Sequence, residues 1–281
     1  MSDEIKAFYK LRTETNWTKR YESPYPVRRY FFRTLYRLII DYCKNYELVL
    51  DSGCGDGVLS VLLAHQNSEQ RIIAMDISLE GIERAREAAR DYGVEKRMWF
   101  VVGDAEQIPF KSGSFPAVIS SHVLEHLPDF DKGVREIVRT MRGDGTAIIA
   151  LPVCLSICSM VQLGDDGYWK LSRKSLFAFW KGLVRVVIAW LKNQEGVQEG
   201  YAGSQTVPHI RRFPCKAIRR IESGELKTMQ WFADSLLIPY LGQYSSLFLK
   251  LQHYIDTILR NKIFFRNLGN GIIMIARKKN N

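Results

Sequence analysis

Three glycines, Gly53, Gly55 and Gly57, alternate with other residues directly after an apolar run that ends at Asp51. The apolar run Val58–Ala64 follows them and has the composition of a helix. This order predicts a strand, a tight turn and a helix N-terminus. Glycine permits positive φ and leaves bare backbone for a ligand, and the first turn of a helix offers free N–H groups. The segment therefore predicts a cradle for a nucleotide-like cofactor.

Polar residues follow four of the apolar strands that we expect. The strands expected at 47–51, 71–76, 98–102 and 117–121 lead to Asp51, Asp76, Asp104 and Ser121. Helical patterns separate these strands, and such alternation predicts a parallel sheet covered on both faces. Ligands of these sheets bind beyond the carboxyl ends of the strands. We therefore expect the four side chains to converge on one site.

The spacing of the glycines narrows the class of ligand. The dinucleotide fingerprint G-x-G-x-x-G is followed by an acid about twenty residues later. Here the third glycine comes one residue early, and Val58 occupies its place. Asp76 lies at about the right distance to bind a ribose diol. The pattern favours a nucleoside ligand over a dinucleotide with a bridging pyrophosphate.

Four motifs together resemble class I S-adenosylmethionine-dependent methyltransferases, most closely the small-molecule branch that acts on quinones, sterols and lipids. They are Asp51-x-Gly53-x-Gly55-x-Gly57, Asp76, Gly103-Asp104-Ala105 and Phe115–Leu127. The resemblance covers about residues 46 to 153 and the final strands. It implies an α/β fold with a Rossmann-like, seven-stranded, mostly parallel sheet, helices on both faces and helical cap inserts. It implies S-adenosylmethionine as cofactor and S-adenosylhomocysteine as product.

The resemblance implies a role for each matched position. Gly53 and Gly55 would let backbone meet the methionine part of the cofactor, in one loop with Gly57, and Asp51 would help to hold its amino group. At the nucleoside end, Asp76 would accept hydrogen bonds from both ribose hydroxyls, and Ile77 would pack on the adenine face. Asp104, with Ala105 beside it, would accept from the adenine amino group. Ser121 and His122 would line the sulfonium end. Taken singly, Asp76 or Asp104 could instead cap a helix or turn.

Three histidines are candidates for a catalytic base: His122, His126 and His209. A base is needed only if the acceptor must lose a proton. The stretch His209–Phe213 is similar to a His-x-Arg-x-aromatic segment that shapes the acceptor pocket in many of these enzymes. The alternative is that Arg211 and Arg212 are solvated charges at the start of a helix.

The segment His122-Val-Leu-Glu125-His126 also matches the H-x-x-E-H signature of zinc proteases. Its position directly after a sheet strand, inside a nucleoside-binding pattern, favours a structural role. We therefore expect no metal.

The remaining elements are predicted from periodicity and from glycine and proline positions. We expect helices at 28–44, 58–65, 78–90, near Val123, and at 130–141 with an end at Gly143. We expect a glycine-rich loop at 196–203, a basic helix at 209–221, and antiparallel strands at 231–238 and 271–277. The predicted units are an N-terminal helical lid (1–45), a cofactor-binding core (46–153), a helical cap insert (154–207), and a C-terminal part of the core (208–281) with a second insert at about 240–268.

The two inserts are the regions that could select the acceptor. Residues 175–191 are apolar and aromatic, broken only by Lys181 and Arg185, and this composition suits a membrane interface. We expect a small, hydrophobic or lipid-linked acceptor and peripheral membrane contact through this segment. The alternatives are a cap packed over a soluble acceptor and a dimer interface, so a homo-oligomer stays open.

Charge and cysteine content bear on location and partners. The net charge is +10, and the segment from Trp169 to Arg220 holds eleven Lys or Arg and two acids. The five cysteines contain no CxxC pair, which argues against a disulfide framework. The N-terminus is charged, which argues against a signal peptide. We therefore expect a cytoplasmic protein. An RNA methyltransferase is an alternative that would use the basic surface, although no separate RNA-binding module is visible. A non-catalytic S-adenosylmethionine-binding protein is another.

Overall fold

Seven strands form one sheet in the computed structural model of the chain, which describes residues 21–23, 26–155, 173–199, 209–223, 225–234, 245–262 and 264–279. The strands are β1 (Leu48–Ser52), β2 (Arg71–Asp76), β3 (Met98–Val102), β4 (Phe115–Ser121), β5 (Met141–Pro152), β8 (Leu226–Ala233) and β9 (Gly271–Lys278). Their order across the sheet is β3-β2-β1-β4-β5-β9-β8. The pairs from β3 to β5 are parallel, whereas β9 is antiparallel to both β5 and β8. The predicted seven-stranded, mostly parallel sheet is confirmed.

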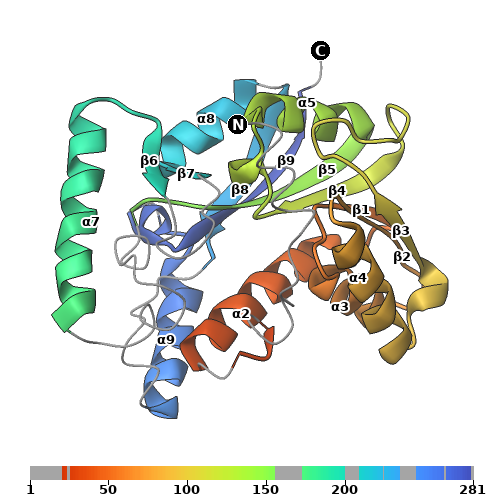
Figure 1. Ribbon diagram of the computed structural model, residues 1–281, viewed down its shortest axis with the longest axis horizontal. Coiled ribbons are helices and arrows are strands. Elements are labelled where there is room, and N and C mark those ends of the chain that lie inside the picture. The colour runs from red at the N-terminus through yellow and green to blue at the C-terminus, as the bar shows by residue number, and fades with distance from the viewer. Residues whose placement is uncertain are drawn as a thin grey trace.

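Helices cover both faces of this sheet, as predicted (Figure 1). The helices α2 (Pro26–Cys43), α3 (Val58–Gln66) and α4 (Leu79–Asp91) lie below it in the view, and α5 (Phe130–Thr140) and α8 (Pro214–Ser223) lie above it. Successive residues of a strand point to opposite faces. Val49 accordingly packs in the cluster that contains α2 and α3 residues, and Leu50 in the cluster of α5 and α8. One strand thus joins two hydrophobic layers.

The connection from β4 to α5 differs from the prediction. We expected a helix near Val123, but the chain makes only the short 3₁₀ turn η3 (Leu124–His126). Pro128 explains this difference, because a proline restricts the residue before it to extended backbone. Leu127 has that conformation, and α5 then begins anew with the Asp129 side chain accepting the Lys132 N–H at 3.0 Å.

The end of α5 also differs from the prediction. We expected a helix over 130–141 with Gly143 as its end signal; the helix ends one residue early, at Thr140, and Gly143 lies within β5. Met141 is fully buried and pairs with Phe115 of β4. Packing of this residue in the sheet therefore outweighs the local helix-ending signal of the glycine.

The chain after β5 contains strands that the sequence did not indicate. Helix α7 (Arg173–Leu191) is present as predicted, but β6 (Gly196–Glu199) and β7 (His209–Arg212) form a separate antiparallel pair. The predictions of a loop from 196 and of a helix from 209 were wrong at these residues. A Cβ on Gly196 would lie 2.0 Å from the Arg211 carbonyl oxygen, so this glycine permits close strand pairing. Helix α8 begins at Pro214, which is tolerated at a first helical position. Strand β8 likewise begins at Leu226, earlier than the predicted 231.

The second insert is attached to α2. Its helix α9 (Ser246–Leu259) is followed by the 3₁₀ turn η6 (Phe265–Leu268). The Tyr30 hydroxyl of α2 donates to Asp256 Oδ2 at 2.6 Å, and Gln252 Nε2 donates to Asp256 Oδ1 at 2.8 Å. Burial and the Asp256 carboxylate raise the pKa of Tyr30 well above its usual value. The hydroxyl therefore stays protonated and keeps donating to Asp256.

Several predicted regions lie outside the described residues. These are 1–20 and 24–25 of the lid, 156–172 and 200–207 of the first insert, and 208 and 235–244 of the C-terminal part, which include the end of the strand predicted at 231–238. The division of the chain into these four units remains a prediction. Among the helices that the structure describes, none is long and apolar enough to cross a membrane.

Candidate functional site

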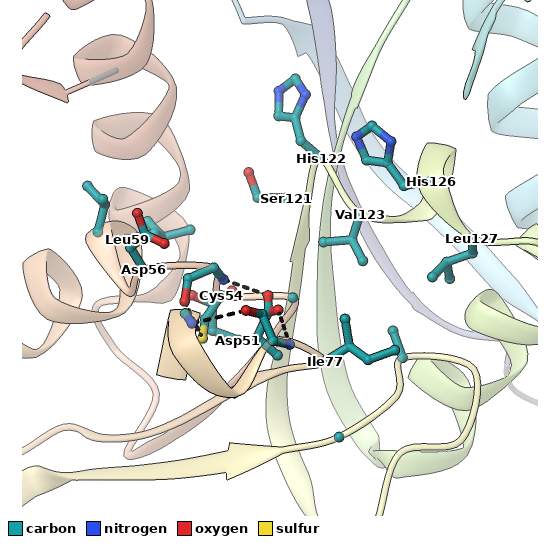
Figure 2. A pocket seen from close by; sticks show the side chains of 18 of the residues that line it. Asp51, Cys54, Asp56, Leu59, Ile77, Ser121, His122, Val123, His126 and Leu127 are labelled. Atoms are coloured by element: carbon teal, nitrogen blue, oxygen red, sulfur yellow. Dashed lines mark hydrogen bonds between the residues drawn. The ribbon is translucent and has the colours of Figure 1, made fainter. Parts of the chain in front are cut away.

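A pocket lies at the carboxyl ends of β1, β2 and β4, where the acids were expected to converge (Figure 2). Ten of the predicted site residues line it: Asp51, Gly53, Gly55, Asp76, Ile77, Asp104, Ala105, Ser121, His122 and His126. Gly57 is not among the described residues that line the pocket, and the side chain of His209 lies outside the description. Gly57 instead lets α3 approach α4, because a Cβ there would lie 2.6 Å from that of Ala85. His209 is the first residue of β7.

The glycine loop has the backbone that its sequence predicts. Gly53, Gly55 and Gly57 have φ angles of +85°, +55° and +72°. The Gly53 N–H donates to the Met75 carbonyl at 2.7 Å, and the Gly55 N–H donates to Asp76 Oδ2 at 2.7 Å. The loop is therefore fixed to the end of β2 and presents bare backbone to the pocket.

Asp76 holds two backbone segments together at the pocket wall. Its Oδ2 accepts from the Gly55 N–H, and its Oδ1 accepts from the Ser78 N–H at 2.9 Å. Burial raises the pKa of Asp76, and these two hydrogen bonds oppose that shift. Each carboxylate oxygen retains further acceptor capacity. Asp76 can therefore fix the loop and still accept hydrogen bonds from a ligand.

Asp104 both caps a turn and lines the pocket. Its Oδ1 accepts from the Glu106 N–H at 2.8 Å, which is a local turn interaction. The same residue lines the pocket together with Ala105. The hydrogen bond to the Glu106 N–H thus fixes the orientation of the Asp104 carboxylate at the pocket.

Asp51 is buried at the base of the pocket, with 1% of its surface exposed. Ser60 Oγ of α3 donates to Asp51 Oδ2 at 2.5 Å. Burial raises the pKa of Asp51 from 3.8 to about 6, with Ser60 opposing the shift and Asp76 adding to it. A positively charged group placed beside Asp51 would relieve this cost of burying its charge.

A stability prediction follows for Asp51→Asn. The pKa of Asp51 is higher in the folded protein than in the unfolded chain. The neutral carboxyl therefore makes its whole contribution to stability below pH 3.8, and this contribution is lost as the pH rises through 6. Asp51→Asn should therefore raise the free energy of unfolding by about 3 kcal/mol at pH 7.5, and this gain should shrink toward zero below pH 4. Urea unfolding at both pH values measures this, with the exposed Asp91→Asn as control. A gain that does not depend on pH would contradict the assignment.

His122 and His126 lie beside a buried carboxylate. The imidazole atoms His122 Nδ1 and His126 Nε2 are 3.4 and 3.7 Å from Glu125 Oε1. Burial by itself would raise the pKa of Glu125, but the charges of His126 and His122 outweigh it and lower the pKa to about 2. Figure 2 shows Ser121 at the end of β4, and both histidines with Val123 on the segment that follows this strand. Among the residues described, no group of three or more His, Cys, Asp and Glu is arranged to hold a metal ion.

Residues 50–149 match the family described as "Methyltransferase domain". A solved 1,6-didemethyltoxoflavin-N1-methyltransferase of Burkholderia thailandensis, with 1,6-didemethyltoxoflavin and S-adenosylhomocysteine bound, has a TM-score of 0.51 and 14% identity, covering 88% of this chain and 78% of that chain. The fold is the Rossmann-like methyltransferase fold.

Two of the curated relatives that match in sequence show how much of the chain is shared. Ajmaline N-methyltransferase of Rauvolfia serpentina is 38% identical over 106 residues, which are 38% of this chain and 36% of the relative. Demethylmenaquinone methyltransferase of Lactobacillus johnsonii is 27% identical over 170 residues, which are 60% of this chain and 63% of the relative. The matched region is thus less than two thirds of either relative.

Several pocket residues of this methyltransferase fold were missed in the sequence. From α2 these are Phe32, Leu35 and Tyr36, and from the other elements Cys54, Asp56, Leu59, Arg84, Val123, Leu127 and Pro128. Arg84 lies 3.2 Å from Asp56 Oδ1 and 2.8 Å from Glu80 Oε1. The spacing of Glu80 and Arg84 predicts their ion pair, but no local signal shows that α4 turns Arg84 toward the pocket.

The two arginines of the His209–Phe213 stretch are not solvated. Arg211 and Arg212 are 8% and 7% exposed, and they lie on strand β7. The interpretation as solvated charges at a helix start was therefore wrong. The Arg212 guanidinium lies 4.1 Å from the Phe130 ring centre and donates to Glu195 Oε2 at 3.3 Å. Burial lowers the pKa of Arg212, and the charge of Glu125 opposes this shift, so β7 adds a buried cation beside the histidine segment.

Proposed function

We propose that this protein is an S-adenosylmethionine-dependent methyltransferase. The observation that carries the proposal is the convergence of Asp51, Asp76 and Asp104 on one pocket with a glycine loop of positive φ. These groups suit the chemistry of that cofactor. A cationic amino group fits Asp51, two ribose hydroxyls fit the free acceptor capacity of Asp76, and an adenine amino group fits Asp104. The cofactor supplies an activated methyl group, and the protein positions the acceptor in line with it.

The acceptor that we infer is a small, hydrophobic molecule. Its part of the pocket is proposed to be the space between α2, which contributes Phe32, Leu35 and Tyr36, and the segment of Ser121 and His122. The apolar and aromatic walls favour an apolar acceptor. The names of two matched relatives, ajmaline N-methyltransferase and demethylmenaquinone methyltransferase, support a small-molecule acceptor. His122, His126 and His209 remain the candidates for a base.

Incubation with radiolabelled S-adenosylmethionine and a fractionated host extract tests this function. Label in the organic-soluble fraction is the expected result. Label in RNA would instead identify an RNA methyltransferase. Cofactor binding without label in any fraction would identify a non-catalytic cofactor-binding protein.

We also propose that α7 contacts the membrane surface from which a lipid-like acceptor would come. Its inner residues Val186 and Ala189 are buried, whereas Trp180 and Trp190 are 62% and 67% exposed. Other exposed apolar residues on α7 are Phe177, Val184, Val187, Ile188 and Leu191. The helix sequence contains cations and no acid. Aromatic residues with cations suit an anionic lipid interface.

Replacing both exposed tryptophans of α7 should release the protein from vesicles. For the Trp180→Ser, Trp190→Ser double variant we expect about ten-fold weaker co-sedimentation with vesicles of phosphatidylcholine and phosphatidylglycerol, because two interfacial aromatic groups are lost. Trp99→Ser is the matched control, since Trp99 is 47% exposed on β3. No binding of the wild-type protein, or equal binding of all variants, would contradict the membrane contact.

A further inference from the structure

Glu125 is a buried anion behind the pocket wall. Its side chain is 2% exposed, and within the described residues its carboxylate oxygens accept no hydrogen bond. The charged or titratable groups that face it are His122 and His126 of its own segment and Arg212 of β7. A fixed anion of this kind attracts an N–H of a neighbouring imidazole, so it biases which ring nitrogen carries the proton.

The backbone holds His122 firmly in place. Its φ is +57°, a left-handed conformation that is uncommon for residues other than glycine. Its N–H donates to the Ala150 carbonyl of β5 at 2.9 Å. The position of the His122 backbone is therefore fixed, and from it the ring places Nδ1 3.4 Å from Glu125 Oε1.

The other ring nitrogen of His122 has no hydrogen-bond partner in the described part of the chain. Nε2 is buried and makes no hydrogen bond to any described residue, although His122 itself lines the pocket. A buried polar atom without a partner is unfavourable, so it marks a position that a bound molecule can complete. The hydrogen-bond capacity of Nε2 is thus left for a molecule that enters the pocket.

We propose that Glu125 is a positioning residue that holds His122 as the Nδ1–H tautomer, so that Nε2 is the base that takes a proton from the acceptor. This inference rests on the proposed methyltransferase function and deepens it. The same orientation of a base by a carboxylate operates in catalytic triads. The acceptor is then a molecule that loses a proton on methylation, such as a hydroxyl, phenol or amine, and not a thioether nucleophile.

The proton and electron balance of the step is simple. A lone pair of the acceptor heteroatom forms the bond to the methyl carbon while the carbon–sulfur bond breaks with its electron pair on sulfur. The heteroatom loses its proton to His122 Nε2, and the resulting imidazolium is stabilised by Glu125. The proton then leaves to solvent when the product departs.

Nitrogen NMR of the histidine side chains tests the tautomer directly. The ¹⁵N-labelled protein is measured at pH 8.5 with S-adenosylhomocysteine, and His122 is expected as Nδ1–H with unprotonated Nε2. An Nε2–H tautomer would overturn the proposal. If S-adenosylhomocysteine does not bind, the proposed function fails, while the tautomer of the free protein still tests the role of Glu125.

Two variants separate the effect of Glu125 from that of its other neighbour. In Glu125→Met, where the carboxylate is lost at similar size, His122 should shift to the Nε2–H tautomer. His126→Gln is the matched control, because it removes the other imidazole and should leave the tautomer of His122 unchanged. An Nδ1–H tautomer that persists in Glu125→Met would overturn the role of Glu125. If this variant does not fold, the wild-type spectrum decides.

Kinetics with the labelled acceptor fraction provide the second readout. His122→Gln should lower kcat by about 10²–10⁴-fold, because general base catalysis is lost. The KM for S-adenosylmethionine should stay unchanged, since the carboxylates and the glycine loop are intact. His65→Gln, at an exposed position on α3, is the activity control. An unchanged kcat in His122→Gln would overturn the assignment of the base.

Discussion

Gly53→Ala should abolish S-adenosylhomocysteine binding and destabilise the protein. The φ of Gly53 is +85°, and a Cβ there would lie 2.3 Å from Val123 Cγ2, well inside contact distance. The left-handed conformation costs alanine about 1–2 kcal/mol, and forcing a methyl into a packed site about 1–3 kcal/mol. We expect the free energy of unfolding to fall by about 2–4 kcal/mol and affinity for S-adenosylhomocysteine to fall by about 100-fold or more, because the loop must move off the ligand.

Gly113→Ala is a matched control for this prediction. Gly113 has a φ of +71°, but a Cβ there would meet no atom within 4 Å. Its substitution therefore introduces the backbone strain without the clash, and it lies outside the pocket lining. We expect a loss of about 1 kcal/mol in stability and unchanged S-adenosylhomocysteine binding. Equal effects of both substitutions on binding would show that the loop geometry at Gly53 does not matter.

Asp76→Ala should remove cofactor binding while the protein stays folded. The substitution deletes the acceptor of the Gly55 and Ser78 N–H groups and the proposed acceptor of the ribose hydroxyls. Hydrogen bonds to a charged group contribute about 1.5–3 kcal/mol each, so losing the ribose contacts should weaken binding by about 100-fold or more. The free energy of unfolding should change less, because burial already raises the pKa of Asp76 and removing its charge relieves that cost.

Calorimetric titration and urea unfolding of the same variant check both parts of this prediction. Asp91→Ala is the control, because Asp91 is an exposed aspartate at the end of α4. It should bind S-adenosylhomocysteine as the wild-type protein does. If Asp76→Ala bound S-adenosylhomocysteine with wild-type affinity, the Asp76 carboxylate would not contact the ligand. Its role would then be only to hold the glycine loop in place.

Local signals explain why the sheet and most of the cofactor pocket could be predicted. Strands such as β2 are continuous apolar runs, the helix start at Ser78 is a side-chain cap, and the glycine loop needs positive φ wherever it occurs. Each of these is decided by neighbours in the sequence. The convergence of Asp51 and Asp76 then follows from the parallel order of the strands.

Long-range packing explains what could not be predicted. Strand β7 was expected as part of a basic helix, yet it pairs with β6, both of its arginines are buried, and Arg212 stacks on Phe130. The α2 residues Phe32 and Tyr36 reach the pocket through the position of the whole helix, which α9 fixes through Tyr30. The burial of Glu125 likewise depends on contacts from distant segments. The H-x-x-E-H motif alone therefore indicated only a structural role for this residue.

Isothermal titration of the wild-type protein with S-adenosylhomocysteine tests the central claim most directly. The structure places a glycine loop and three acids around one pocket, so a single saturable site per chain is predicted. The binding heat should disappear in Gly53→Ala and Asp76→Ala and persist in Gly113→Ala and Asp91→Ala. No binding heat with the wild-type protein across several temperatures, or equal binding by all four variants, would contradict the account.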